Sequence, residues 1–218
     1  GPCLALSAWN FPLLLPARKI AAALAALAAG CPVISRPASE APGSCFALGQ
    51  VLIDAGLPAG VFSILTGDPN PMVRDLISSP IIRKVSLTGS VPIGKEILRQ
   101  CAEGIKKVTM ELGGHAPVIV YPDFDPISAA KKLATTKFRN CGQVCISPSR
   151  FYVHRSIIKP FAKAFVEVTK NLKTGSGLDE GVTTGPLIRE KSLKNALSLI
   201  ADAQVKGAEL LLGGNRDT

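Results

Sequence analysis

The sequence predicts an α/β fold built on a doubly wound parallel sheet. Short apolar runs alternate with segments of helical period along much of the chain, a pattern typical of parallel βαβ units. Glycines close two of the helical segments, Gly30 after 17–29 and Gly56 after 43–55, as expected at helix ends. With 47% apolar and 19% charged residues among 218, the chain has a globular profile and can bury a sizeable core.

The expected elements follow one another without an internal repeat. Helices are expected at the periodic segments 17–29, 43–55, 72–78, 92–103, 126–138, 156–172 and 190–206. Strands are expected at the short apolar runs 32–35, 61–65, 84–87, 107–112, 117–121, 151–154 and 209–212. A boundary near Gly113–Gly114 divides a first α/β domain, 1–113, from part of a second, 114–218. Polar motifs follow several of the strands, and active sites in such sheets gather at those carboxyl ends.

Composition excludes several classes of partner. The formal net charge is +9, but Lys and Arg are scattered and only 5% of residues are aromatic, so we expect no nucleic-acid surface. Six cysteines are too sparse for a disulfide framework, which favours a reduced, cytoplasmic setting. The apolar run 20–31 is too short to span a bilayer, so we expect no membrane partner.

The stretch "FRNCGQVCIS" places Cys141 and Cys145 four positions apart. A metal site would need three or four ligands, and the two histidines, His115 and His154, are not spaced as ligands with these cysteines; we expect no metal. A redox pair would prefer C-x-x-C over the C-x-x-x-C found here. A catalytic thiolate suits a loop in which Gly142 lets backbone N–H groups approach the sulfur. Two inert, buried cysteines remain the fourth alternative.

Five motifs occur in the order "SAWNFPLLLPARK", "SRPASEAP", "LTGSVPIGKEI", "TMELGGHAP" and "FRNCGQVC". Together they resemble the aldehyde dehydrogenase superfamily, from about Leu6 to about Gly214, with Cys145 following Glu111 by 34 positions. The resemblance implies that 1–113 is part of a Rossmann-like NAD(P)-binding domain and that 114–218 is part of the catalytic domain.

The resemblance also implies three catalytic roles. Cys145 is similar to the nucleophile that attacks the aldehyde carbon, and Glu111 to the base that activates water against the resulting thioester. A partly apolar cleft would raise the pKa of such a carboxyl group. Asn10 is similar to an oxyanion donor that acts beside the Cys145 backbone N–H. The structural alternatives are a strand-end ion pair for Glu111 and a helix cap for Asn10.

The cofactor residues are likewise implied by the resemblance. "TGSVPIG" is similar to the pyrophosphate site of the family, where Gly89 lets backbone approach and Ser90 opens a helix whose N–H groups favour anions. Leu112 and Gly113 resemble positions that line the nicotinamide, and Trp9 resembles the residue beside the oxyanion donor on the cofactor side.

At the adenosine end the sequence departs from the family's common "KPAE", because "RPAS" puts Arg36 and Ser39 at the ends of the motif. A carboxylate there would repel a 2′-phosphate, whereas serine does not, and a guanidinium can bind the phosphate as a fork. We therefore predict NADP use at least as good as NAD use. Glu40 is adjacent and acts in the opposite direction.

Two arginines narrow the expected substrate. Arg18 and Arg139 resemble positions that bind the far carboxylate in the succinic-semialdehyde branch of the family, and bidentate pairing would favour a semialdehyde acid over an apolar aldehyde. The alternative for Arg18 is a helix cap or a pair with a surface acid. An ω-semialdehyde acid, succinic semialdehyde first, is the predicted substrate.

Cys141 has two interpretations, a bystander or a reversible disulfide partner of Cys145 under oxidation. Members of the family are considerably longer than this chain, and the full-length protein is expected to be a homo-oligomer. The competing hypotheses are an incomplete fragment that binds cofactor or a partner without turnover, and a binding module with vestigial motifs; the joint presence of Cys145 and Glu111 speaks against the module.

Overall fold

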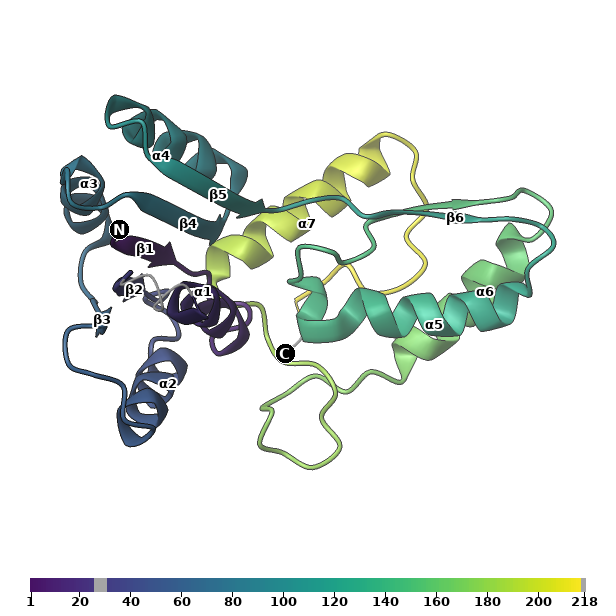
Figure 1. The fold of residues 1–218 in the computed structure, drawn as a ribbon. Coiled ribbons are helices and arrows are strands. Elements are labelled where there is room, and N and C mark those ends of the chain that lie inside the picture. The colour runs from purple at the N-terminus through teal and green to yellow at the C-terminus, as the bar shows by residue number, and fades with distance from the viewer. Residues whose placement is uncertain (26–30, 217–218) are drawn as a thin grey trace. The chain divides into compact units, whose positions relative to one another are not determined.

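The computed structural model describes residues 1–25 and 31–216. The chain divides into two compact units, Gly1–Gly113 and Gly114–Thr218, and both combine helices with parallel strands (Figure 1). Within the described residues, no helix is long and apolar enough to cross a membrane.

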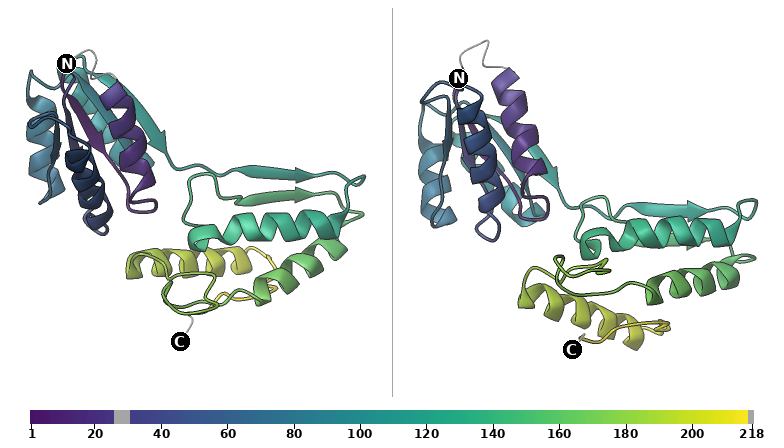
Figure 2. Two further views of the ribbon diagram at one scale, coloured as in Figure 1. Left: turned by 60° about the horizontal axis from the view of Figure 1, so that its bottom comes forward. Right: turned by 90° about the horizontal axis from the view of Figure 1, so that it is seen from below.

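The first unit is built around one parallel sheet with the strand order β3-β2-β1-β4-β5. Its elements are β1 (Cys3–Leu6), α1 (Leu14–Ala25), β2 (Val33–Arg36), α2 (Gly43–Asp54), β3 (Phe62–Ile64), α3 (Pro69–Ser78), β4 (Lys84–Gly89), α4 (Val91–Glu103) and β5 (Lys107–Leu112). The sheet bears helices on both faces (Figure 2), so the predicted doubly wound class is confirmed.

Side-chain alternation along β1 explains the two layers of helices. Leu4 points into one core together with Ile77 of α3 and Ile97 of α4, while Ala5 points into a second core with Ile20 of α1. Because successive strand residues face opposite sides of a sheet, four apolar residues are enough to anchor both layers. The central strand is therefore buried throughout most of its length.

The second unit contains a two-stranded parallel sheet, β6-β7. Its elements are β6 (Pro117–Val120), α5 (Pro126–Phe138), the 3₁₀ turn η2 (Arg139–Gly142), β7 (Arg150–Val153), α6 (Ile158–Lys170) and α7 (Glu190–Val205). One face of the sheet packs on α5 and α6 through Val120, Ala130 and Phe161. The other face leaves Ile119 and Tyr152 exposed.

Several expected elements differ from those observed. The strand β1 was not predicted, and the expected strand 209–212 is wrong, because these described residues lie in no sheet. The helix expected from Ala17 begins at Leu14, since Pro16 is tolerated in a first helical turn; its expected end falls in 26–30, outside the described residues. The helix expected from Met72 begins at Pro69.

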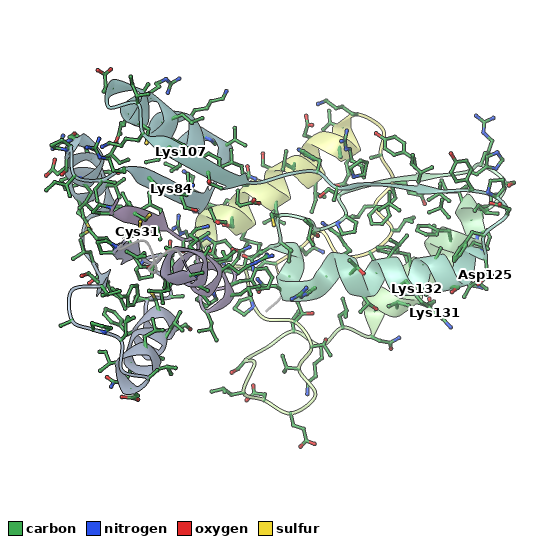
Figure 3. All side chains as sticks on the ribbon, viewed as in Figure 1. Cys31, Lys84, Lys107, Asp125, Lys131 and Lys132 are labelled. Atoms are coloured by element: carbon green, nitrogen blue, oxygen red, sulfur yellow. The ribbon has the colours of Figure 1, made fainter. Side chains whose placement is uncertain are left out.

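Two aspartates explain where helices begin. Asp68 caps α3 by accepting a hydrogen bond from the Asn70 backbone N–H at 3.0 Å. Asp125 caps α5 in the same way by accepting from the Ser128 N–H at 2.7 Å, and it lies at the start of that helix in Figure 3. A proline follows each cap at the first helical position, where its missing N–H costs nothing.

Candidate active site

The centre of the first sheet is a topological switch point. The strand β1 pairs with β2 on one side and with β4 on the other. The strands that follow β1 in the chain are therefore added first on one side of it and then on the other. Ligands of doubly wound sheets bind at the carboxyl ends of such strands. Ser7, which directly follows β1, is 7% exposed, and among the described residues its Oγ has no hydrogen-bond partner. Because buried hydroxyl groups normally make a hydrogen bond, this one could bind a polar group of a ligand. The sequence did not reveal this feature.

The strand β4 ends at Gly89 and leads directly into α4. Ser90 is the N-cap residue in an extended conformation, and its side chain makes no capping hydrogen bond, which leaves the first-turn N–H groups available to an anion. Gly94 allows α4 to lie close to β5, because a Cβ at this position would meet the Leu112 Cδ2 at 2.8 Å. Among the predicted cofactor residues, Ser90 and Leu112 are thus linked through α4, whereas nothing crowds Gly113.

Arg36 and Ser39 lie together at the end of β2. The Arg36 Nη2 donates to the Ser39 Oγ at 2.7 Å, while the buried Arg36 Nε has no partner among the described residues. Parallel pairing brings the end of β3 alongside, since the Leu65 N–H donates to the Ser35 carbonyl at 3.0 Å. Burial lowers the pKa of Arg36, and the charge of Asp68 opposes that shift. A cation and an acid therefore share this corner of the first unit.

Glu111 lies on β5 in register with Thr88 of β4. Lys19 of α1 donates to the Thr88 Oγ1 at 2.6 Å; burial lowers the pKa of Lys19, while Glu111 raises it and Arg18 lowers it further. Sequence reasoning missed Lys19, although it stands next to Arg18 in "PARK". The partly apolar cleft expected around Glu111 is not found within this unit: Glu111 is exposed, because it belongs to the open face of the edge strand β5.

The alternatives for Asn10 and Arg18 can now be judged. Asn10 is half-buried and precedes the start of α1 at Leu14 by four positions, so it is not the N-cap of that helix. Arg18 is exposed in the body of α1 and, among the residues described, forms no ion pair with an acid. Trp9 is half-buried beside Asn10.

The loop that carries Cys145 begins with a run of left-handed backbone. Asn140, Cys141 and Gly142 have φ values of 51°, 55° and 72°. Asparagine and glycine tolerate this region, but for Cys141 it is an unusual conformation. Cys145 is exposed, whereas Cys141 is half-buried and burial raises the pKa of the Cys141 thiol. Since the thiolate is the nucleophile, the geometry favours Cys145 over Cys141.

The side chain of Gln143 fastens this loop to a distant part of the same unit. Its Nε2 donates to the Asn140 carbonyl at 3.2 Å and to the Pro186 carbonyl at 3.4 Å. Its Oε1 accepts from the Ile188 N–H at 3.0 Å. The motif that contains Gln143 was recognised from the sequence, but this role was not, because its partners lie 43 and 45 positions away.

A second set of hydrogen bonds joins the end of the loop to α5. The Oγ of the buried Ser147 donates to the Lys137 carbonyl at 3.1 Å, and the Lys137 Nζ donates to the Ser147 Oγ at 3.3 Å. Burial lowers the pKa of Lys137. Gly142 packs on this residue, because a Cβ there would lie 3.3 Å from the Lys137 carbonyl. The loop therefore begins and ends on one helical turn of α5.

Gly114 approaches the loop that carries Cys145 from the start of the second unit. A Cβ at this position would lie 3.4 Å from the carbonyl oxygen of Cys145. Arg139, also in this unit, is exposed. The other predicted site residues belong to the first unit, and the structure describes each unit by itself.

Two further features bear on the chemistry. Among residues 1–25 and 31–216, no group of three His, Cys, Asp or Glu side chains could hold a metal ion. Lys84 and Lys107 form a register pair at the amino ends of β4 and β5 (Figure 3), the ends opposite those that carry Ser90 and Leu112. These two lysines therefore add no positive charge to the proposed dinucleotide end of the sheet.

The chain matches the aldehyde dehydrogenase family along residues 1–218 and belongs to it. It is 45% identical over 214 residues to the NADP(+) succinate-semialdehyde dehydrogenase GabD of Escherichia coli strain K12, covering 98% of this chain and 44% of that protein. It is 42% identical over 214 residues to a glutarate-semialdehyde dehydrogenase of Pseudomonas aeruginosa, with the same coverages of 98% and 44%.

Solved structures agree with the sequence relatives. A succinate-semialdehyde dehydrogenase from Burkholderia pseudomallei superposes with a TM-score of 0.95 at 43% identity, covering 100% of this chain and 44% of that one. The chain thus spans less than half the length of the curated relatives described above.

Proposed function

We propose that the protein carrying this chain oxidises an aldehyde with a distal carboxylate, succinic semialdehyde first, to the corresponding acid with NAD(P)⁺. The observation that supports this most is that Cys145 is exposed on a loop held by the side chain of Gln143, in a chain of the aldehyde dehydrogenase family. Similar relatives are named for succinate, glutarate and aspartate semialdehydes and for 3-sulfolactaldehyde, all of which are aldehydes that bear an acidic group.

The proposed reaction begins when the Cys145 thiolate adds to the carbonyl carbon to form a thiohemiacetal. The Cys145 backbone N–H and the Asn10 amide donate hydrogen bonds to the oxygen that becomes negative. Bound NAD(P)⁺ would supply the hydride acceptor that conversion of the thiohemiacetal into a thioester requires. Glu111 then takes a proton from water, and the resulting hydroxide equivalent cleaves the thioester and releases the acid and the Cys145 thiolate.

The first unit offers groups that fit a dinucleotide. The Ser7 Oγ and Arg36 Nε, which have no hydrogen-bond partner among the described residues, are buried polar atoms at the carboxyl edge of the sheet, and the α4 N-terminus beginning at Ser90 suits a pyrophosphate. Arg36 and Ser39, bonded to each other, present no carboxylate of their own to a 2′-phosphate, which favours NADP. The remaining proposed cofactor contacts are Trp9, Gly89, Leu112 and Gly113.

The carboxylate of the substrate would pair with Arg18 and Arg139. In the intact protein, Arg139→Ala is expected to raise KM for succinic semialdehyde about 10-fold or more while changing KM for propanal less than twofold, because the loss of a charge-assisted pair affects only the acidic substrate. Arg155→Ala, at another exposed arginine of the same unit, serves as the matched control. Equal effects of Arg139→Ala on both aldehydes would contradict the carboxylate clamp.

The competing proposal is that these 218 residues alone bind cofactor or a partner but do not turn over. Assaying the isolated chain beside the intact protein separates the two, since only the intact protein is expected to oxidise the aldehyde. A cytoplasmic location and a homo-oligomeric parent protein remain predictions.

A further inference from the structure

Three hydrogen bonds converge on the carboxamide of Gln143, two positions before Cys145. Two of them leave the loop and reach Pro186 and Ile188. The amide donates to one backbone carbonyl and accepts from a nearby backbone N–H, so it behaves like one residue of a neighbouring strand. This pairing fixes both the position and the direction of the partner segment.

The third hydrogen bond acts inside the loop. The Nε2 donates to the carbonyl of Asn140, the residue that opens the left-handed run, and the Gln143 backbone N–H donates to the same oxygen at 3.0 Å. Two donors on one carbonyl oppose relaxation of Asn140 and Cys141 toward ordinary φ values. Strained conformations persist where surrounding contacts over-determine them.

We propose that Gln143 is a positioning residue for Cys145: its carboxamide holds the Asn140–Gly142 turn in its left-handed form and couples the nucleophile loop to the Pro186–Ile188 segment. The inference rests on the proposed function of Cys145 as nucleophile. Gln143 does not touch the reacting atoms in this account; it determines where the thiol is presented.

Two substitutions in the intact protein test the proposal. Gln143→Met removes the hydrogen bonds to Asn140, Pro186 and Ile188 at similar side-chain length, whereas Gln143→Glu keeps an acceptor for the Ile188 N–H but loses the donor to Asn140 and Pro186. Gln143→Met is expected to lower kcat about 10-fold or more with KM changed less than twofold, because a displaced thiol affects reaction more than binding. Gln143→Glu is expected to lose less, and its loss is expected to shrink as the pH falls and the new carboxyl group regains a proton to donate.

Amide hydrogen exchange provides a readout that does not depend on turnover. Gln143→Met is expected to speed exchange of the Ile188 N–H, while Gln143→Glu leaves it protected. Gln50→Met is the control, because Gln50 also donates from its side chain, to Asp54 at 2.8 Å at an exposed site on α2, and the variant is expected to change neither kcat nor exchange at Ile188.

Unchanged kcat in Gln143→Met, unchanged exchange at Ile188, or equal losses in Gln143→Met and Gln143→Glu at every pH would overturn the positioning role. If the Gln143→Met protein fails to fold, the nearly isosteric Gln143→Glu variant tests the proposal by itself. A purely structural defect would not produce the pH-dependent recovery of activity that is expected for Gln143→Glu. The Cys145→Ser variant tests the proposed function separately from the role of Gln143. If that variant keeps full activity, Cys145 is not the nucleophile, whatever Gln143 does.

Discussion

The two units fix their site residues by different means. In the first unit, Ser7, Arg36 and Ser90 stand at the ends of strands whose positions are set by a five-stranded ladder and by two cores. In the second, Cys145 stands on a loop that begins with left-handed residues and is held by the side chains of Gln143 and Ser147. Backbone pairing thus positions the proposed cofactor-binding residues of the first unit, and side-chain hydrogen bonds position the loop that carries Cys145.

This difference determines where substitutions act. A sheet with cores on both faces resists local change, so damage to the first unit should appear as lost stability. The left-handed conformation of Cys141 costs of order 1–3 kcal/mol, and the hydrogen bonds from Gln143 to the Asn140 carbonyl oppose its relaxation. Damage to the loop that carries Cys145 should therefore appear as lost activity with little loss of stability, and the Gln143 variants test that half of the comparison.

Overpacking at Gly94 should produce the larger effect in the first unit. Gly94→Val places a side chain against Leu112, whose methyl groups would lie 2.8–3.0 Å from the new Cβ. We expect the free energy of unfolding to fall by about 1–3 kcal/mol, and NADPH binding to weaken because the N-terminus of α4 shifts. Denaturant unfolding and a fluorescence titration measure the two effects. Gly43→Val is the matched control, since nothing lies within 4 Å of a Cβ there; equal stability of the two variants would contradict the close-packing account.

Cofactor preference should respond more weakly, at the corner shared by Arg36 and Asp68. Asp68→Asn keeps a side chain that can cap α3 but removes the negative charge that acts on Arg36. We expect NADPH to bind up to about 5-fold more tightly while NADH is unchanged, as befits a charge interaction that is partly exposed to solvent, and the gain should shrink at high salt. Asp75→Asn, at an exposed acid of α3 that pairs with Arg74, serves as the control in titrations of both cofactors. A gain for NADH as large as that for NADPH, or the same gain from Asp75→Asn, would contradict this role for Asp68.

The same contrast explains which features the sequence predicts. Residues 107–112 and 126–138 are predicted with their observed bounds, because periodicity and a capping Asp125 leave a local signal. The strand β1, "CLAL", lacks β-branched residues and is a strand because it pairs on both sides. The run 209–212, "ELLL", also lacks β-branched residues, and it has no neighbouring strand among the described residues.

The candidate site divides in the same way. Motif order was enough to single out Cys145 and Arg36, and the family is confirmed. The partners of Gln143 and the contact of Lys19 with Thr88 join positions far apart in the chain, and no local pattern records them. Glu111 is exposed because of its place on an edge strand, which sequence alternation cannot distinguish from a covered one.

The most direct test of the account is to trap the acyl-enzyme. In the intact protein, Glu111→Gln removes the proposed base, so mixing with succinic semialdehyde and NADP⁺ should produce about one reduced cofactor per site and then stop. Acid quenching and peptide mass spectrometry should find the acyl group on Cys145 and not on Cys141, whose thiol has a pKa raised by burial. Steady turnover by Glu111→Gln without an adduct, or an acyl group on Cys141, would contradict the central claim.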